Sequence, residues 1–149
     1  MSQTLAMELP NKIKAIGVVA SNFGADEVNK IKDVQPFSIL FIHGTNDPIF
    51  PYEKGVIEAF NTKRGRVLGI EQSIDFMCKL NGNNKEVITI PIENTNVHDD
   101  CISERTIYPN PENPSLKVEH IKVKSGGHLA RRKRTTLNKT ACWKNDSRF

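Results

Sequence analysis

Residues 37–48 have the sequence FSILFIHGTNDP, in which an apolar run leads into a polar turn. The run from Phe37 to Ile42 is almost wholly apolar, which is typical of a strand buried inside a sheet. The turn that follows reaches Asp47 and Pro48, residue types that are common where a strand ends. This stretch therefore predicts a buried strand that delivers a polar turn to one edge of a sheet.

The segments on either side predict further helices and strands. Residues 12–20, KIKAIGVVA, have the same apolar character as 37–42 and predict a second strand buried on both faces. Helix-forming residues occupy 3–9 before Pro10, and an apolar stripe predicts an amphipathic helix over 70–80. Alternating apolar and polar residues predict three half-buried strands, within 86–92, 101–109 and 115–123.

Helices interleaved with apolar strands predict an α/β fold with a mostly parallel sheet and flanking helices. In such sheets, polar functional residues follow the carboxyl ends of the strands, where Asp47 and His128 both stand. A carboxylate that holds one ring nitrogen of a histidine leaves the other nitrogen free to accept a proton from a nucleophilic hydroxyl. The alternative is that Asp47 only caps its own turn and that His128 is an ordinary turn residue.

The residues around this pair resemble a known family. Residues 41–52, FIHGTNDPIFPY, are similar to the acid-bearing segment of the polyhydroxybutyrate depolymerase and feruloyl esterase-like α/β-hydrolases. Residues 126–128, Gly-Gly-His, are similar to the histidine-bearing turn of that family. The resemblance covers residues 1–128 and implies a partial α/β-hydrolase fold, the C-terminal portion of an esterase domain without its N-terminal half. It also implies that Asp47 is the catalytic acid and His128 the catalytic histidine.

The nucleophile of such an enzyme is missing from the sequence. No serine stands in Gly-x-Ser-x-Gly, the sharp turn that exposes a nucleophilic serine. Residues 1–10 resemble the helix that follows this turn, so the resemblance implies that the serine and the oxyanion donors lie before Met1. We therefore expect a carboxylic ester hydrolase by family but an inactive fragment in this chain. The substrates implied are polyhydroxyalkanoate, feruloyl or short acyl esters, and the alternative is a non-catalytic module that binds acyl ligands.

The positive charge of the chain is concentrated at one end. The net charge is +4, and residues 129–149 carry seven Lys and Arg against one Asp, a net +6 that leaves −2 for residues 1–128. The resemblance stops at this boundary, so we interpret 129–149 as a basic tail that is disordered or read out of frame. The alternative is a basic arm, residues 131–134, that binds nucleic acid. Because no aromatic residues interleave with these charges, we expect no nucleic-acid partner.

The sequence predicts no cofactor and no metal site. Residues 98–100, His-Asp-Asp, are adjacent in a predicted solvated loop and cannot all face one ion. Three cysteines at wide spacing fit neither a disulfide framework nor a zinc site. For His43 we expect a packing and hydrogen-bonding role, and for His120 an exposed position on a charged strand.

The sequence also restricts the partners of the chain. No apolar run reaches the roughly 18 to 20 residues that cross a bilayer, and the first residues lack the pattern of a secretory signal, so we expect no membrane partner. The family resemblance implies that an intact parent is secreted or periplasmic. Without earlier strands, residues 14–20, KAIGVVA, would present an unpaired apolar edge, which favours self-association.

Overall fold

The computed structural model describes residues 2–28, 34–59, 62–84, 86–95 and 100–128. The predicted tail, residues 129–149, lies outside the described residues, as do His98 and Asp99 of the predicted loop. No helix within the described ranges is long and apolar enough to cross a membrane.

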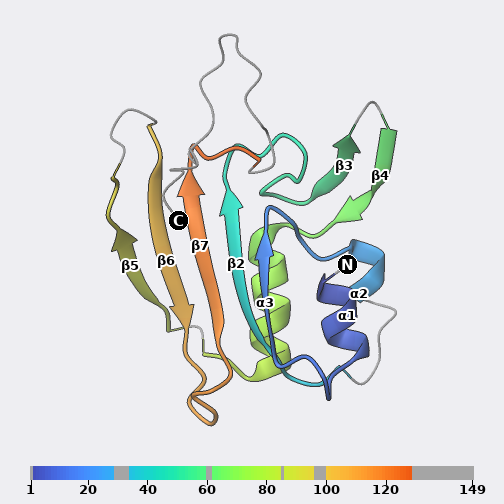
Figure 1. The fold of residues 1–149 in the computed structure, drawn as a ribbon, viewed down its shortest axis with the longest axis vertical. Coiled ribbons are helices and arrows are strands. Elements are labelled where there is room, and N and C mark those ends of the chain that lie inside the picture. The colour runs from blue at the N-terminus through green and yellow to red at the C-terminus, as the bar shows by residue number, and fades with distance from the viewer. Residues whose placement is uncertain (1, 29–33, 60–61, 85, 96–99, 129–149) are drawn as a thin grey trace, which may run out of the picture.

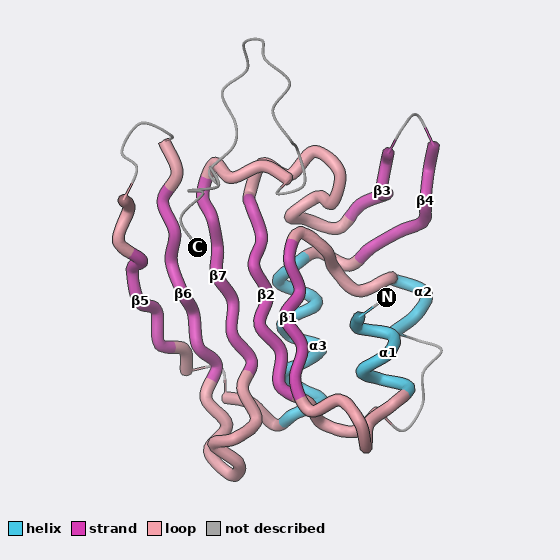
Figure 2. The backbone as a smooth tube through the Cα atoms, in the orientation of Figure 1, coloured by secondary structure: helices cyan, strands magenta, loops and turns pink. Residues whose placement is uncertain are grey.

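Figures 1 and 2 show the helices and strands of the described chain. In chain order they are α1 Ser2–Glu8, β1 Ala15–Val19, α2 Ala25–Val28, β2 Ser38–Gly44, β3 Gly55–Ala59, β4 Thr62–Val67, α3 Ile70–Asn81, β5 Ile88–Ile92, β6 Ile102–Tyr108 and β7 Val118–Lys124. The two predicted helices are confirmed as α1 and α3, and the five predicted strands as β1, β2, β5, β6 and β7. The short helix α2 and the β3–β4 hairpin were not predicted.

The main sheet of the described residues has the strand order β1-β2-β7-β6-β5. β1, β2 and β7 run parallel, whereas β6 is antiparallel to both β7 and β5. The mostly parallel sheet of a partial α/β-hydrolase fold is therefore a wrong prediction, because this sheet is mixed. No described helix lies between β5 and β7, and strands that follow one another without a helical crossover pair antiparallel.

The core lies on one face of this sheet. Ile39 and Phe41 of β2 and Val118 of β7 belong to one buried cluster with Met7 of α1 and Met77 of α3. Figure 2 shows α3 behind β1 and β2, with α1 and α2 beside β1. The cluster also contains Ala6, Val18, Phe23, Phe37, Ile70, Ile74 and Cys78. The helices therefore hold the three parallel strands from one side.

β1 and β2 are half-buried strands rather than strands buried on both faces. In β1, Val18 is buried while Gly17 and Val19 are exposed. In β2, the buried residues Ile39 and Phe41 alternate with partly exposed neighbours. The prediction of full burial was wrong because, among the described residues, helices cover only one face of these strands.

The cysteines depart from expectation in one respect. Cys78 is a buried thiol on α3. Cys101 is also buried, and it is disulfide-bonded. The spacing of the cysteines does not fit a disulfide framework, and the disulfide at Cys101 departs from what that spacing indicates.

Candidate active site

Asp47 lies in the turn that follows β2, and its carboxylate organises that turn. Oδ1 accepts hydrogen bonds from the backbone N–H groups of Ile49, at 2.8 Å, and Phe50, at 2.9 Å. This is the local capping that Asp favours in turns. Pro48, which separates Asp47 from Ile49, has no N–H that needs an acceptor. The Asp47 side chain is fully shielded from solvent, with Oδ2 left to face a partner from elsewhere in the chain.

The turn after β7 is held against the turn after β2 by backbone and hydroxyl contacts. Thr45 N–H donates to Val123 O at 3.0 Å, and Asn46 N–H donates to Gly126 O at 2.8 Å. In return, Ser125 N–H donates to Thr45 Oγ1 at 3.0 Å. Because β2 and β7 are parallel neighbours, their carboxyl ends lie at the same sheet edge, and these bonds fix the two turns together.

Gly44 permits this close approach of the two turns. A Cβ atom at Gly44 would overlap Gly126 O and lie 2.9 Å from Gly127 O. Contacts this short do not occur between real Cβ atoms and backbone oxygens, so only glycine fits where β2 ends. Gly44 therefore lets the turn that carries His128 approach the turn that carries Asp47.

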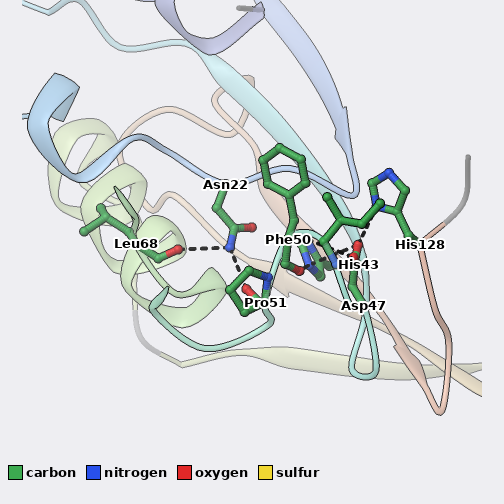
Figure 3. Close-up of polar contacts among 8 residues, drawn as sticks. Asn22, His43, Asp47, Phe50, Pro51, Leu68 and His128 are labelled. Atoms are coloured by element: carbon green, nitrogen blue, oxygen red, sulfur yellow. Dashed lines mark hydrogen bonds and ion pairs between the residues drawn. The ribbon is translucent and has the colours of Figure 1, made fainter. Parts of the chain in front are cut away.

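Asp47 and His128, the two predicted site residues, meet at this edge (Figure 3). His128 Nδ1 lies 2.8 Å from Asp47 Oδ2, although the residues are 81 positions apart in the chain. The ring of Phe50 stacks on the imidazole, with 6.0 Å between centroids and 10° between planes. A carboxylate can only accept, so Nδ1 carries a proton, and in the neutral imidazole Nε2, on the far side of the ring, then presents a lone pair. The His128 side chain keeps 16% of its surface exposed, which suits a proton acceptor that must reach a substrate.

His43 is buried beside this pair. It is 1% exposed, its Nε2 lies 3.0 Å from Phe50 O, and the same atom lies 3.9 Å from Asp47 Oδ2. Burial lowers the pKa of His43, and the contacts with Phe50 and Asp47 oppose this only in part. The expected packing and hydrogen-bonding role of His43 is confirmed.

His120 is buried, so the prediction that it is exposed was wrong. It is 3% exposed and pairs in register with Phe41, on the face of the sheet that the helices cover. The ring of Tyr52 lies over it at 6.0 Å between centroids. Burial, with smaller effects of the Lys122 and His43 charges in the same direction, lowers the pKa of His120 to about 4.

Asn22 is a supporting residue that the sequence analysis missed. Its Nδ2 donates to Pro51 O at 3.1 Å and to Leu68 O at 2.9 Å, and thereby ties the turn after β2 to the chain before α3 (Figure 3). Gln3 of α1 donates in turn to Asn22 O at 3.3 Å. These partners are distant in sequence, so no local pattern around Asn22 could have indicated them.

The described ranges place neither a serine hydroxyl on His128 nor a metal cluster beside the pair. None of the described serines hydrogen-bonds to His128. No group of three or more His, Cys, Asp and Glu residues there is placed to hold a metal ion.

Comparison with protein-family models, with curated proteins and with solved structures finds no match for this chain.

The contact at Gly44 generates a first prediction. Gly44→Ala should lower the free energy of unfolding by about 1 to 3 kcal/mol, because the added methyl group must push the 126–127 backbone away. Urea unfolding of the variant and of the wild type measures the difference. Gly17→Ala in β1 is the matched control, since a Cβ there meets nothing within 4 Å. Equal destabilisation by both substitutions would contradict the role given to Gly44.

Burial of His120 generates a second prediction, that stability falls as the pH drops below 6.5. Between the ordinary pKa of 6.5 and the folded-state pKa of about 4, the unfolded chain binds a proton that the folded chain excludes. The free energy of unfolding should therefore decrease by on the order of 3 kcal/mol on reaching pH 4, at about 1.4 kcal/mol per pKa unit. Urea unfolding from pH 7 to pH 4 measures the change.

The control for this pH dependence is His120→Phe, which keeps a buried ring but cannot titrate. Its unfolding free energy should depend less steeply on pH than that of the wild type, although His43, whose pKa burial also lowers, contributes with the same sign. Identical pH profiles for the two proteins would rule out His120 as the source.

Proposed function

We propose that the chain carries the acid and the histidine of a serine-type carboxylic ester hydrolase. The observation that supports this most is the 2.8 Å contact between Asp47 Oδ2 and His128 Nδ1, made by turns at the ends of two neighbouring strands. In this function, His128 Nε2 accepts the proton of an attacking hydroxyl. Asp47 holds the ring in the required tautomer and stabilises its charged form.

In such an enzyme, each half of the reaction uses two proton transfers at this histidine. A hydroxyl oxygen attacks the ester carbonyl, a C–O bond forms, and the hydroxyl proton passes to Nε2. When the tetrahedral intermediate collapses, the bond to the alcohol breaks and Nε2 returns the proton to the leaving alkoxide. Water repeats the same cycle to release the acid.

The proposed substrate class rests on the resemblance of residues 41–52 and 126–128 to polyhydroxybutyrate depolymerases and feruloyl esterases. It comprises polyhydroxyalkanoate, feruloyl and short acyl esters. The mixed sheet plays no part in this proposal, which depends on the pair, on the two turns that carry it and on Gly44, which lets them approach.

The hydrogen bonds of the Asp47 carboxylate determine how an Asn at this position would orient its amide, so Asp47→Asn tests the tautomer of His128. Oδ1 already accepts two backbone N–H groups, so an Asn at this position keeps its oxygen there and turns its NH2 toward His128. The amide then donates to Nδ1, and the His128 proton moves to Nε2. In a serine protease the same change lowers kcat about ten-thousand-fold, because the histidine has the wrong tautomer.

We predict that the wild type shows the Nδ1–H tautomer of His128 in long-range 1H–15N correlation spectra near neutral pH and that Asp47→Asn shows the Nε2–H tautomer. Asp75→Asn, at an exposed ion pair with Lys79, is the control and should leave the His128 signals unchanged. A wild-type protein in which His128 carries its proton on Nε2 would overturn the proposed function.

The missing Gly-x-Ser-x-Gly serine generates a separate prediction about activity. The 149-residue chain should show negligible hydrolysis of p-nitrophenyl acetate and butyrate, with no component that a serine reagent inhibits. The reason is that loss of a triad serine alone costs about a millionfold in turnover. Turnover that phenylmethanesulfonyl fluoride abolishes would show that a serine of this chain acts as the nucleophile.

A further inference from the structure

Phe50 connects the separate parts of the candidate site. Its N–H donates to Asp47 Oδ1 at 2.9 Å, and its ring stacks on His128 with 10° between the planes. Its carbonyl lies 3.0 Å from His43 Nε2. One residue of the turn therefore contacts the acid, the histidine and a second, buried histidine. Figure 3 labels all four residues.

The contact with Phe50 fixes the proton of His43. A carbonyl can only accept, so His43 Nε2 carries hydrogen and donates it. Nδ1 of His43 then has a lone pair, and it is buried without a hydrogen-bond partner among the described residues. At 3.9 Å, Nε2 is too far from Asp47 Oδ2 for a hydrogen bond. His43 therefore does not compete with His128 for the carboxylate.

His43 is also fixed in place. It belongs to β2, pairs in register with Lys122 of β7, and is 1% exposed. The ring of Tyr52 packs against it edge-on, at 5.8 Å and 75°. Because the sheet holds His43 in place, its Nε2–H donor anchors the Phe50 carbonyl and thereby the turn after β2.

We propose that His43 is a positioning residue for the Asp47–His128 pair and acts through Phe50. The inference rests on the proposed function of that pair. Without the bond from His43, the Phe50 carbonyl loses its donor and the Phe50–Pro51 peptide can rotate. This rotation shifts the Cα of Phe50, which also carries the N–H of the preceding peptide, so the bond from Phe50 N–H to Asp47 Oδ1 lengthens. Asn22 then restrains the turn from its other end only, through Pro51 O. The carboxylate rotates, and His128 loses the acceptor that selects its tautomer.

Three substitutions separate this role from simple filling of the core. His43→Gln places an amide N–H where Nε2 stands and should preserve the bond to Phe50. His43→Asn has a shorter side chain that cannot reach the carbonyl. His43→Phe fills the volume of the imidazole with a ring that has no donor. If His43 were only a core residue, Phe would substitute for it better than Gln.

The readout is the protonated ring nitrogen of His128 in the full chain, recorded by long-range 1H–15N correlation. We expect the Nδ1–H signal in the wild type and in His43→Gln, and its loss in His43→Asn and His43→Phe, with backbone amide signals of α3, β5 and β6 unchanged. An unchanged Nδ1–H signal in His43→Asn overturns the proposal, and so does loss of the signal in a folded His43→Gln. If His43→Phe does not fold, His43→Asn decides.

Failure of this inference is distinguishable from failure of the proposed function. If the wild type shows Nδ1–H and Asp47→Asn abolishes it while the His43 variants keep it, the pair stands and His43 has no positioning role. If the wild type lacks the Nδ1–H signal, the pair itself does not form in solution, and both proposals fail.

Discussion

A carboxylate that is removed from water must find hydrogen-bond donors for both of its oxygens, and the site is built around this requirement at Asp47. Its side chain is fully shielded, and three N–H groups meet its charge. Two of these groups belong to the turn that contains Asp47, and the third is on His128. The local turn and the long-range pair therefore form a single unit, in which loss of one donor leaves a buried charge short of a partner.

Burial gives different properties to the three histidines of the described chain. His128 lies at the sheet edge with part of its ring exposed and a carboxylate on Nδ1. His43 and His120 lie under the covered face of the sheet, where removal from water lowers the pKa of each and favours the neutral ring. Only His128 combines access with a charged partner, which is why the acid–base role is assigned to it and a supporting role to His43.

The location of the pair could be predicted because the rule that governs it is simple. Polar residues after neighbouring parallel strands share one sheet edge, and Asp47 and His128 follow β2 and β7. The sequence also indicates the mixed sheet. The segments that form β5, β6 and β7 alternate apolar and polar residues, which is typical of antiparallel strands. The two continuous apolar runs, 12–20 and 37–42, favour a parallel sheet instead, and the fold class predicted from them is wrong.

Other features depended on contacts that local sequence does not contain. His120 shares a strand face with Val118, so burial of one carries the other inward, but charged neighbours on the strand suggested exposure. β4 is exposed along most of its length, so its sequence has no apolar pattern that would predict a strand. It is a strand because it pairs with β3. The contacts of Asn22 with Pro51 and Leu68 span 29 and 46 residues, beyond the reach of any turn motif.

The pairing of β2 with β7 has a consequence for how the protein folds. β1 and β2 are close in sequence, as are β5, β6 and β7, so each group can assemble early from nearby residues. Only the β2–β7 ladder joins the two groups into one sheet. Forming it closes a long loop, and the chain entropy lost in this closure is offset only after the ladder contacts have formed. Asp47 and His128 stand on opposite sides of that seam. The candidate site is therefore complete only once both groups have docked, and it is lost as soon as they separate, even where each group keeps its own strands.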